Sequence, residues 1–537
     1  MTTTAVRAPE GGASTARGRP RHPARGRLAL LAAAVVAAVG VAVATSRFGI
    51  GLTPDSVTYV SGATSLANGD GYTDFLGRDI GVFPPGYSAA LAVGELAGGG
   101  VLGWARVLSA LCLATVVVLA NVLLRRHVRS RAVVAAATAV VACSAVLLEI
   151  YSKALSEHLF VPVVLGFVLV GERLMRRPAD LAACAGLVLL AWAGFALRYA
   201  GIVLVGIGAL VVLAAGWPGN GRAAIARAAA VGAASALFPV ALMVRNERVT
   251  GNPMGSRSEA SASLVTNVRR AANEVSQWLA TQLAPPAVRA LVAGAAVLAV
   301  VAGVALALRR GRRVLPDDWR AMVPLALFTA VYLSYLVASA SVVAFAAINT
   351  RFMLPLYVPA VVFGAWAFER VRARLPGPRW RLAVTVVAAA WVVANVAWFA
   401  GRAVNYARDG AGGYASEFWH DSQILADVDG LDLSAPTFSN DPYAISLFLG
   451  ESVRQTVART AFASDAETGK LPAFVQTVAC AGRAQLVWFD IAGRPHLYTP
   501  EELREHLDLV PLVERPDGTI YELRPRPGVT PACRRGA

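Results

Sequence analysis

Charged residues are scarce in this 537-residue chain, in which 16% of the residues are charged and 56% are hydrophobic. Soluble domains carry about a quarter of charged residues, so this composition excludes an ordinary soluble globular protein. The long apolar runs predict membrane-spanning helices, each of which needs about 20 predominantly apolar residues. Charged residues are also missing from the middle of these runs. Ion-coupled transporters usually carry one near the membrane midplane, so the pattern disfavours that class.

Two motif classes are absent as well. No Gly-rich phosphate loop followed by Lys-Ser/Thr occurs, which argues against ATP-driven transport. The five cysteines include no C-x-x-C pair and no His/Cys cluster with zinc spacing. Cys112, Cys143 and Cys184 fall within apolar runs as small hydrophobic residues. Cys480 and Cys533 could form a disulfide if the C-terminal region lies outside the cytoplasm.

Eleven apolar stretches are predicted to span the membrane, which makes the fold class an α-helical polytopic membrane protein. Small residues are abundant in them, as close helix packing in lipid favours. The predicted spans cover residues of about 28–46, 104–124, 132–150, 156–171, 181–197, 200–217, 224–244, 288–308, 321–345, 353–369 and 381–400.

The net charge of +16 is distributed unevenly. Residues 1–401 hold 37 basic and 16 acidic residues, whereas residues 402–537 hold 13 and 18. Every second loop between the predicted spans contains arginine, and cytoplasmic loops are enriched in Lys and Arg. The charge therefore predicts a multi-pass plasma-membrane protein with a cytoplasmic N-terminus, and it does not indicate nucleic-acid binding. The loop arginines are Arg125, Arg126, Arg129, Arg131, Arg173, Arg176, Arg177, Arg222, Arg309, Arg310, Arg312, Arg313, Arg370, Arg372, Arg374 and Arg379.

Three regions follow from this topology. Residues 1–27 are expected to form a disordered basic cytoplasmic tail. Residues 28–401 form a transmembrane domain with long outside loops at 47–103 and 245–287. An odd number of spans places residues 402–537 outside the cytoplasm, as a small α/β domain.

Local patterns predict elements within the outside regions. Amphipathic stretches at about 55–67 and 86–98 favour helices on the membrane surface. Arg515-Pro516-Asp517-Gly518 is a hairpin signal between two strand-like stretches. The remaining predicted elements are a helix at 264–279, strands at 435–438 and 485–489, and helices at 441–449 and 500–507.

Asp55 lies a few residues beyond the first predicted span, in Thr53-Pro54-Asp55-Ser56. One interpretation is structural, because Asp is a favoured residue at a helix N-cap. The other is chemical: a carboxylate at the membrane face can accept the proton of a sugar hydroxyl as that hydroxyl attacks. The two interpretations remain open on this pattern alone.

Glu149, Lys153 and Glu157 surround the loop between the third and fourth spans. Lys153 has i, i+4 spacing to both acids, which favours an interfacial ion pair. Ser156-Glu157 could instead begin a helix, with Glu157 stabilised by the helix dipole. In a third interpretation, Glu157 is a second acid that faces Asp55 and holds the acceptor or a divalent metal ion.

Arginines on the predicted outside form the next candidate set, because sidedness places most Lys and Arg inside. For a single arginine, contact with lipid headgroups is a sufficient explanation. For a set on the Asp55 side, phosphate binding is the favoured role, since guanidinium groups bind phosphate oxygens in a bidentate manner. The candidates are Arg198, Arg245, Arg257 and Arg351.

The assembled motifs resemble the GT-C superfamily of polytopic glycosyltransferases, in particular the branch of the protein O-mannosyltransferases and the lipid A aminoarabinose transferases. The resemblance covers roughly residues 28–370. Its motifs are Pro54-Asp55-Ser56-Val57-Thr58-Tyr59, Phe83-Pro84-Pro85-Gly86-Tyr87, Leu155-Ser156-Glu157, Arg198-Tyr199-Ala200-Gly201, Arg245-Asn246, Gly255-Ser256-Arg257 and Thr350-Arg351-Phe352-Met353-Leu354-Pro355.

This resemblance implies a polyprenyl-phosphate-linked sugar as donor and an extracytoplasmic hydroxyl as acceptor, on a glycan, a lipid or a protein. It implies Asp55 as the base of an inverting transfer, Tyr59 and Tyr87 near the substrate, and basic side chains such as Lys153 on the lipid phosphate. One departure is Ser56, where many relatives carry a second acid, so that acid comes from Glu157 or no metal is needed. The rival hypotheses are a lipid or polysaccharide transporter and a non-catalytic membrane scaffold.

Overall fold

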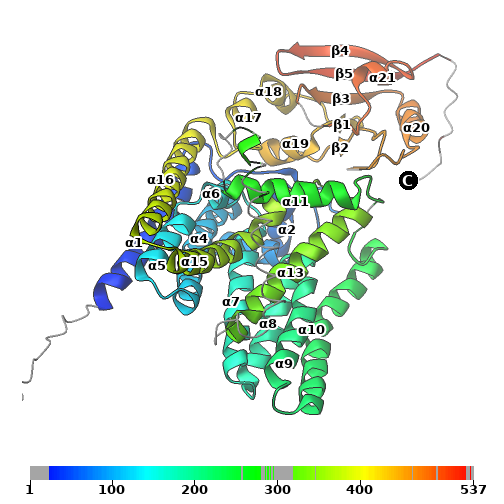
Figure 1. Cartoon of the computed structure of the whole chain (residues 1–537). Helices are drawn as coiled ribbons and strands as arrows, with labels where there is room; N and C mark the ends of the chain where they lie inside the picture. Colours follow the sequence, from blue (N-terminus) through cyan, green and yellow to red (C-terminus); the bar gives the residue numbers. More distant parts are fainter. Residues whose placement is uncertain are drawn as a thin grey trace, which may run out of the picture.

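The computed structural model describes residues 23–255, 258–279, 319–344, 346–462, 464–491 and 494–527, with a few isolated residues between and after them (Figure 1). Most of the predicted tail, the span at 288–308 and Arg257 therefore lie outside the described residues. Within the described part, nine helical stretches are long and apolar enough to cross a membrane. They are Gly26–Ala44, Val101–His127, Arg131–Tyr151, Glu157–Arg176, Tyr199–Gly216, Gly221–Thr250, Arg320–Val342, Thr350–Arg374 and Pro378–Asp409.

These stretches agree with nine of the eleven predicted spans. The predicted span at 181–197 is helix α8, an apolar helix of 17 residues that leads from Asp180, after the end of α7, back to Arg198, which binds Glu157 at the start of α7. Several of the nine are built from more than one element. The elements are α1 (Pro23–Ala44), α4 (Val101–His127), α5 (Arg131–Ala142), α6 (Ala145–Tyr151), α7 (Glu157–Arg176), α8 (Leu181–Leu197), η1 (Tyr199–Ile202), α9 (Val203–Gly216), α10 (Gly221–Thr250), α13 (Trp319–Val342), α14 (Thr350–Met353), η3 (Leu354–Leu356), α15 (Tyr357–Arg374) and α16 (Pro378–Asp409).

The first long loop contains two helices, α2 (Pro54–Asn68) and α3 (Gly86–Leu96), where amphipathic helices were predicted. The Ser88 hydroxyl donates to the Tyr59 carbonyl at 2.9 Å and ties α3 to α2. Gly86 permits a close approach to the end of α8, because a Cβ there would lie 2.5 Å from the Ala196 carbonyl oxygen. The Pro-Pro turn thus places α3 directly against the transmembrane helices.

Helix α11 (Leu264–Leu279) crosses the same end of the molecule. Asn267 on this helix is buried and donates to the Ala340 carbonyl at 2.9 Å, near the end of α13. Further along α11, Glu274 accepts a hydrogen bond from the Thr350 hydroxyl at 3.0 Å. Helix α11 therefore joins the end of α13 to the start of α14.

The C-terminal region forms a five-stranded sheet in the order β2-β1-β3-β5-β4. Strand β1 pairs in parallel with β2 and β3, whereas β5 pairs antiparallel with β3 and β4. Hydrophobic side chains of the sheet and of the helix packed on it form a separate core. The elements are α17 (Glu417–His420), α18 (Gln423–Asp429), β1 (Thr437–Ser439), α19 (Pro442–Leu449), β2 (Arg454–Gln455), α20 (Leu471–Ala481), β3 (Ala484–Phe489), α21 (Pro500–Leu503), β4 (Leu507–Arg515) and β5 (Gly518–Pro525).

The predicted hairpin is present, with β4 and β5 joined at Arg515–Gly518. The predicted helix at 500–507 is wrong in its second half, because the chain leaves α21 after Leu503 and begins β4 at Leu507. Strand β2 and helix α20 were not predicted. Cys480 and Cys533 are joined by a disulfide, the pairing that the sequence left open.

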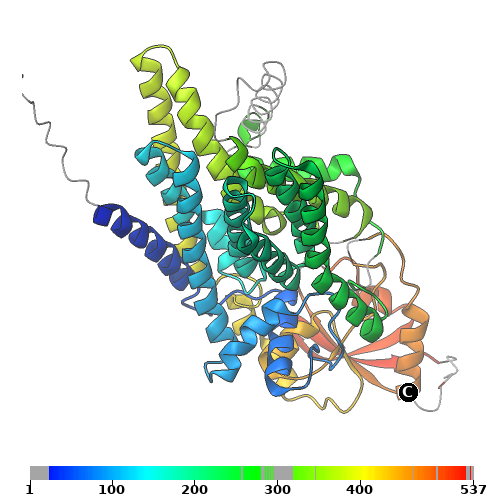
Figure 2. The same ribbon diagram turned by 90° about the horizontal axis from the view of Figure 1, so that it is seen from below.

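The sheet domain packs on the end of the helices that carries α2 and α11 (Figures 1 and 2). The Tyr414 amide donates to the Leu52 carbonyl at 2.8 Å, and the Ser452 hydroxyl donates to the Phe75 carbonyl at 2.6 Å. Gly413 has φ +63°, and a Cβ there would lie 1.8 Å from the Leu52 oxygen. Only glycine fits this contact, so the sheet domain is closely fitted to the segment that leads into α2.

Candidate active site

Asp55 occupies the second position of α2 but does not cap the helix. Thr53 is the N-cap, and its hydroxyl accepts from the Ser56 amide at 3.3 Å while the Ser56 hydroxyl accepts from the Thr53 amide at 3.0 Å. This reciprocal pair is a capping box. The carboxylate of Asp55 is thereby left for other contacts, and its side chain is 36% exposed. The interpretation of Asp55 as a helix N-cap is therefore wrong, because the N-cap of α2 is Thr53, two residues earlier.

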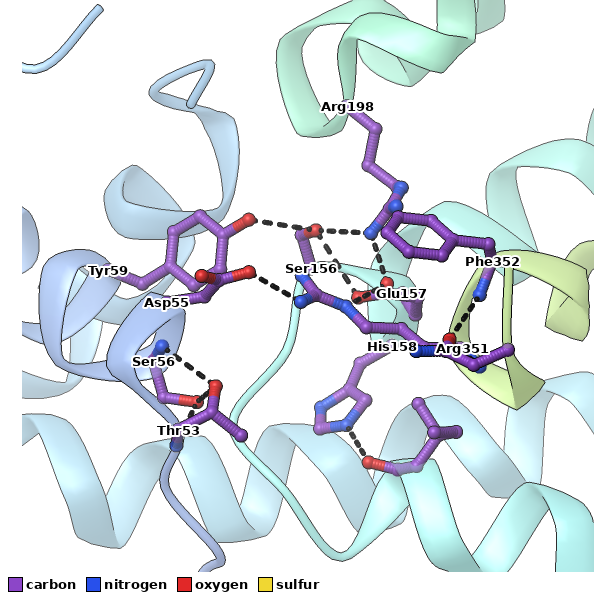
Figure 3. A network of polar contacts seen from close by, with 12 residues as sticks. Thr53, Asp55, Ser56, Tyr59, Ser156, Glu157, His158, Arg198, Arg351 and Phe352 are labelled. Atoms are coloured by element: carbon purple, nitrogen blue, oxygen red, sulfur yellow. Dashed lines mark hydrogen bonds and ion pairs between the residues drawn. The ribbon is translucent and has the colours of Figure 1, made fainter. Parts of the chain in front are cut away.

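Arg351 joins the two acids that the sequence singled out (Figure 3). Its Nη1 lies 2.5 Å from Asp55 Oδ2, and its Nε lies 2.5 Å from Glu157 Oε1. The Asn349 side chain caps α14 by accepting from the Arg351 and Phe352 amides. This cap fixes the short helix from which Arg351 extends. Two carboxylates 102 residues apart in the sequence are thus held by one guanidinium group.

Glu157 begins α7 and has no exposed side-chain surface. It is paired with Arg198 as well as with Arg351. Isolated buried charges are costly, and this cost is offset only when partners and hydrogen bonds are in place. The four groups Asp55, Glu157, Arg198 and Arg351 balance in charge. Glu157 is therefore the buried centre of the network, whereas Asp55 is its accessible edge.

Ser156 connects this network to α2. Its hydroxyl lies 3.3 Å from the Tyr59 hydroxyl and accepts from Arg198 Nη1 at 3.2 Å. Tyr59 is buried, and burial raises the pKa of its phenol to about 12. The phenol is therefore a neutral hydrogen-bonding group at physiological pH and does not act as an acid. Sequence reasoning placed Ser156 only in a possible cap, yet it makes no cap hydrogen bond here.

Aromatic side chains pack around His158, the residue after Glu157. The Tyr87 ring packs edge-on against Tyr59 at 5.1 Å and against His158 at 6.1 Å, and His158 stacks on Tyr151 at 4.8 Å. His158 Nε2 donates to the Ile150 carbonyl at 3.0 Å. Three buried polar atoms around the network lack a hydrogen-bond partner within the described residues: Tyr87 Oη, His158 Nδ1 and Arg198 Nε. Such groups usually have one, so this region retains unused hydrogen-bonding capacity.

Lys153 belongs to a second cluster beside the first. The segment from Ser152 to Ala154 pairs with Gly51, just before α2. The predicted ion pairs of Lys153 are wrong: Glu149 binds Arg402 of α16, and Glu157 binds the two arginines. In the described part of the chain, the Lys153 ammonium has no hydrogen bond or ion pair. Burial lowers its pKa, with Glu149 acting in the opposite direction.

Arg402 was missed by sequence reasoning because it lies 253 residues from Glu149. Its guanidinium also lies over the rings of Trp398 at 5.5 Å and Tyr406 at 5.8 Å. These rings are one turn away on the same helix, so α16 presents the arginine within an aromatic frame. The cluster of Glu149, Lys153 and Arg402 holds one acid and two cations.

Arg245 is not brought into either cluster. It lies 3.3 Å from Asp79 and donates to the Ile80 carbonyl at 3.4 Å, both in the first long loop. Its neighbour Asn246 donates to the Tyr199 hydroxyl at 2.7 Å, and that hydroxyl donates to the Gly81 carbonyl at 2.7 Å. The Arg245-Asn246 pair thus holds the loop that leads to the Pro-Pro turn.

The donor set does not fit a divalent cation between Asp55 and Glu157. Magnesium and calcium take several oxygen ligands, but the Arg351 guanidinium lies between these carboxylates and binds both. No group of three His, Cys, Asp or Glu side chains with metal-binding geometry occurs in the residues that the structure describes. The guanidinium supplies the positive charge at this position.

Comparison with known proteins finds similarity in structure but not in sequence. No family model and no curated protein sequence matches the chain. Two crystal structures of ArnT from Cupriavidus metallidurans, in the apo state and bound to undecaprenyl phosphate, are similar to it. They have 13% and 14% identity and TM-scores of 0.57 and 0.56, and each similarity covers 93% of this chain and 98% of the other.

The archaeal oligosaccharyltransferase AglB from Archaeoglobus fulgidus, in complex with an inhibitory peptide and a dolichol-phosphate, is also similar. Its identity is 12% and its TM-score 0.51, over 86% of this chain and 70% of that one. These similarities extend across both the helices and the sheet domain. The chain has the GT-C fold that its motifs implied.

Proposed function

We propose that this chain is a membrane glycosyltransferase that moves a sugar from a polyprenyl-phosphate donor to a hydroxyl group outside the cytoplasm. The observation that carries the proposal is the Asp55–Arg351–Glu157 bridge at the start of α2. The bridge holds the partly exposed carboxylate of Asp55 in a fixed orientation. The fold is shared with ArnT and AglB structures that contain undecaprenyl phosphate and a dolichol-phosphate.

In the proposed reaction, the Asp55 carboxylate accepts the proton of the acceptor hydroxyl while its oxygen attacks the anomeric carbon of the donor sugar. The bond from that carbon to the phosphate oxygen breaks on the opposite face, so the configuration inverts. Polyprenyl phosphate leaves with the bonding electron pair. Glu157 and Arg351 do not exchange protons in this scheme. Their role is to position Asp55 before the transfer begins.

The donor phosphate is best accommodated beside Lys153 and Arg402. This cluster has one more cation than it has acids, whereas the charges of Arg198 and Arg351 are balanced by Asp55 and Glu157. Negative charge develops on the leaving phosphate as the sugar departs, and fixed cations stabilise it. A lysine and an aromatic-framed arginine at the edge of the helices suit a phosphate at the head of a lipid chain.

The proposed sidedness follows from helix α7. Glu157 starts this helix at the network, and Arg173 and Arg176 lie in its last turn. A 20-residue helix is about 30 Å long, the thickness of a bilayer core. Arginine-rich ends mark the cytoplasmic side. We therefore assign the network and residues 402–537 to the outside.

An Asp55→Asn variant tests the catalytic role. The full chain is placed in lipid nanodiscs with a set of radiolabelled polyprenyl-phosphate sugars and a cell-envelope extract as acceptor source. Loss of a general base lowers the rate by about 100-fold or more. Asp70→Asn is the matched control, since Asp70 lies in the same loop and is exposed. Full transfer by Asp55→Asn would exclude Asp55 as the base.

A further inference from the structure

A cavity lies where the sheet domain meets α11 and the end of α13. Its volume is about 540 Å³, within the range of roughly 300–1,000 Å³ typical of small-molecule sites. It is distinct from the network of Asp55 and is lined from both parts of the molecule. The side chains that define its chemistry are Asn267, Arg270, Arg459, Phe462, Asp465 and His496.

The lining combines an exposed aromatic ring with polar groups of both signs. Phe462 is 61% exposed, and the His496 ring packs edge-on against it at 5.6 Å. Burial lowers the pKa of His496, with Arg494 acting in the same direction, so its imidazole is neutral and offers one donor and one acceptor. The exposed ring of Phe462 offers an apolar surface for the C–H face of a sugar ring. The hydroxyl groups of the sugar need hydrogen-bond donors and acceptors beside that ring.

The charges of the lining do not favour an anionic ligand. Arg459 is already paired with Glu502 at 2.5 Å, and Asp465 contributes a negative charge. Arg270 donates to the Asn267 side chain at 3.2 Å. A phosphate site would need a surplus of cations, as in the cluster of Lys153 and Arg402. The cavity therefore suits an uncharged ligand that carries hydroxyl groups.

Helix α11 connects this cavity to the proposed catalytic network. Asn267 lines the cavity, and Glu274 accepts the hydrogen bond of Thr350, the residue before Arg351. Seven residues of helix rise about 10 Å, a length comparable to one or two sugar rings. Ala347 also lines the cavity, two residues before the Asn349 cap of α14. A ligand in the cavity would therefore lie about one or two sugar rings along α11 from Glu274, the partner of Thr350.

We infer that the acceptor is a neutral glycan chain and that this cavity binds the sugar residues next to the one that receives the new sugar. The inference rests on the proposed function and narrows its acceptor from a glycan, a lipid or a protein to a glycan. The interface of the sheet domain with α11 then serves as an acceptor subsite, and the sheet domain contributes Phe462 and His496 to it.

Binding is tested with the full chain in nanodiscs by saturation-transfer NMR, using neutral linear arabino-, manno- and gluco-oligosaccharides. At least one of these probes should bind. Phe462→Ala should weaken that binding roughly 3- to 10-fold, the effect of one aromatic contact, and Arg270→Gln should weaken it too. Arg269→Gln is the matched control on the same helix, because Arg269 is exposed and does not line the cavity.

Undecaprenyl phosphate binding, measured in the same preparations, separates the two proposals. Oligosaccharide binding that is lowered by Phe462→Ala but not by Arg269→Gln supports the subsite. If undecaprenyl phosphate binds and none of the oligosaccharides does, the acceptor inference fails and the donor proposal stands. Oligosaccharide binding that both cavity variants leave unchanged also overturns the inference. Failure to bind undecaprenyl phosphate counts against the proposed function itself.

Discussion

Replacing Glu157 by Gln should destabilise the protein by removing the charge at the centre of the network. Glu157 is fully buried, and its two partners Arg198 and Arg351 are only 11% and 18% exposed. Removing one partner of a buried ion pair costs about 3–5 kcal/mol. Arg351 keeps Asp55 as a partner, and both arginines retain some solvent, so we expect the lower end, about 3 kcal/mol.

The origin of this loss can be tested with a double variant. In Glu157→Gln the main cost is an uncompensated arginine, so adding Arg198→Gln should restore part of the stability. Coupling energies for residues in contact are about 0.5–3 kcal/mol. The assay is unfolding of the full chain in detergent, followed by the fluorescence of its 11 tryptophans. Additive losses in the double variant would refute the ionic network as the source of the effect.

Two further predictions concern the phosphate cluster and the domain contact. Lys153→Ala should weaken undecaprenyl phosphate binding by about 10-fold or more, the value of a charge-assisted hydrogen bond, whereas Lys470→Ala, at the only other lysine, should not. Because burial lowers the pKa of Lys153, the wild-type protein should lose undecaprenyl phosphate binding as the pH rises, before the usual lysine pKa is reached. The Lys153→Arg variant should retain binding at that pH. Gly413→Ala should lower stability and transfer, because its Cβ would overlap the Leu52 oxygen; Gly450→Ala, also at positive φ but in open space, should have a much smaller effect on both. Thermal unfolding and transfer rates check the last pair, and equal losses in the two glycine variants would contradict the packing argument.

Hydropathy predicted the helices well because the membrane imposes one strong requirement on each of them. For example, α4 covers the predicted span at 104–124, and α7 covers nearly all of the predicted span at 156–171. Helix α8 follows the same rule, because its 17 apolar residues lead from the far end of α7 back to Arg198, which binds Glu157. Strand β2 was missed because two exposed residues show no periodicity.

The network was predicted in its members but not in its pairing. Sidedness placed Asp55, Glu157 and Arg351 at one end of the molecule, since it depends only on loop charge. The pairing of Lys153 followed local spacing and was wrong, because Glu149 finds Arg402 from a distant helix. Partners separated by hundreds of residues depend on helix packing, which spacing along one chain does not encode. Arg402 carried no local signal beyond its place at the end of an apolar run.

The serine at position 56 leaves Asp55 as the carboxylate in the first turn of α2. The resemblance to the GT-C superfamily implied a second acid at this position, but Ser56 is fully buried and its hydroxyl completes the cap with Thr53. An additional carboxylate would be buried beside Asp55 without a cation of its own, which is costly. The carboxylate linked to Asp55 is that of Glu157, because the guanidinium of Arg351 binds both acids. In this chain, therefore, the acid pair is built across two helices, and Arg351 supplies the charge that two adjacent acids would require from another source.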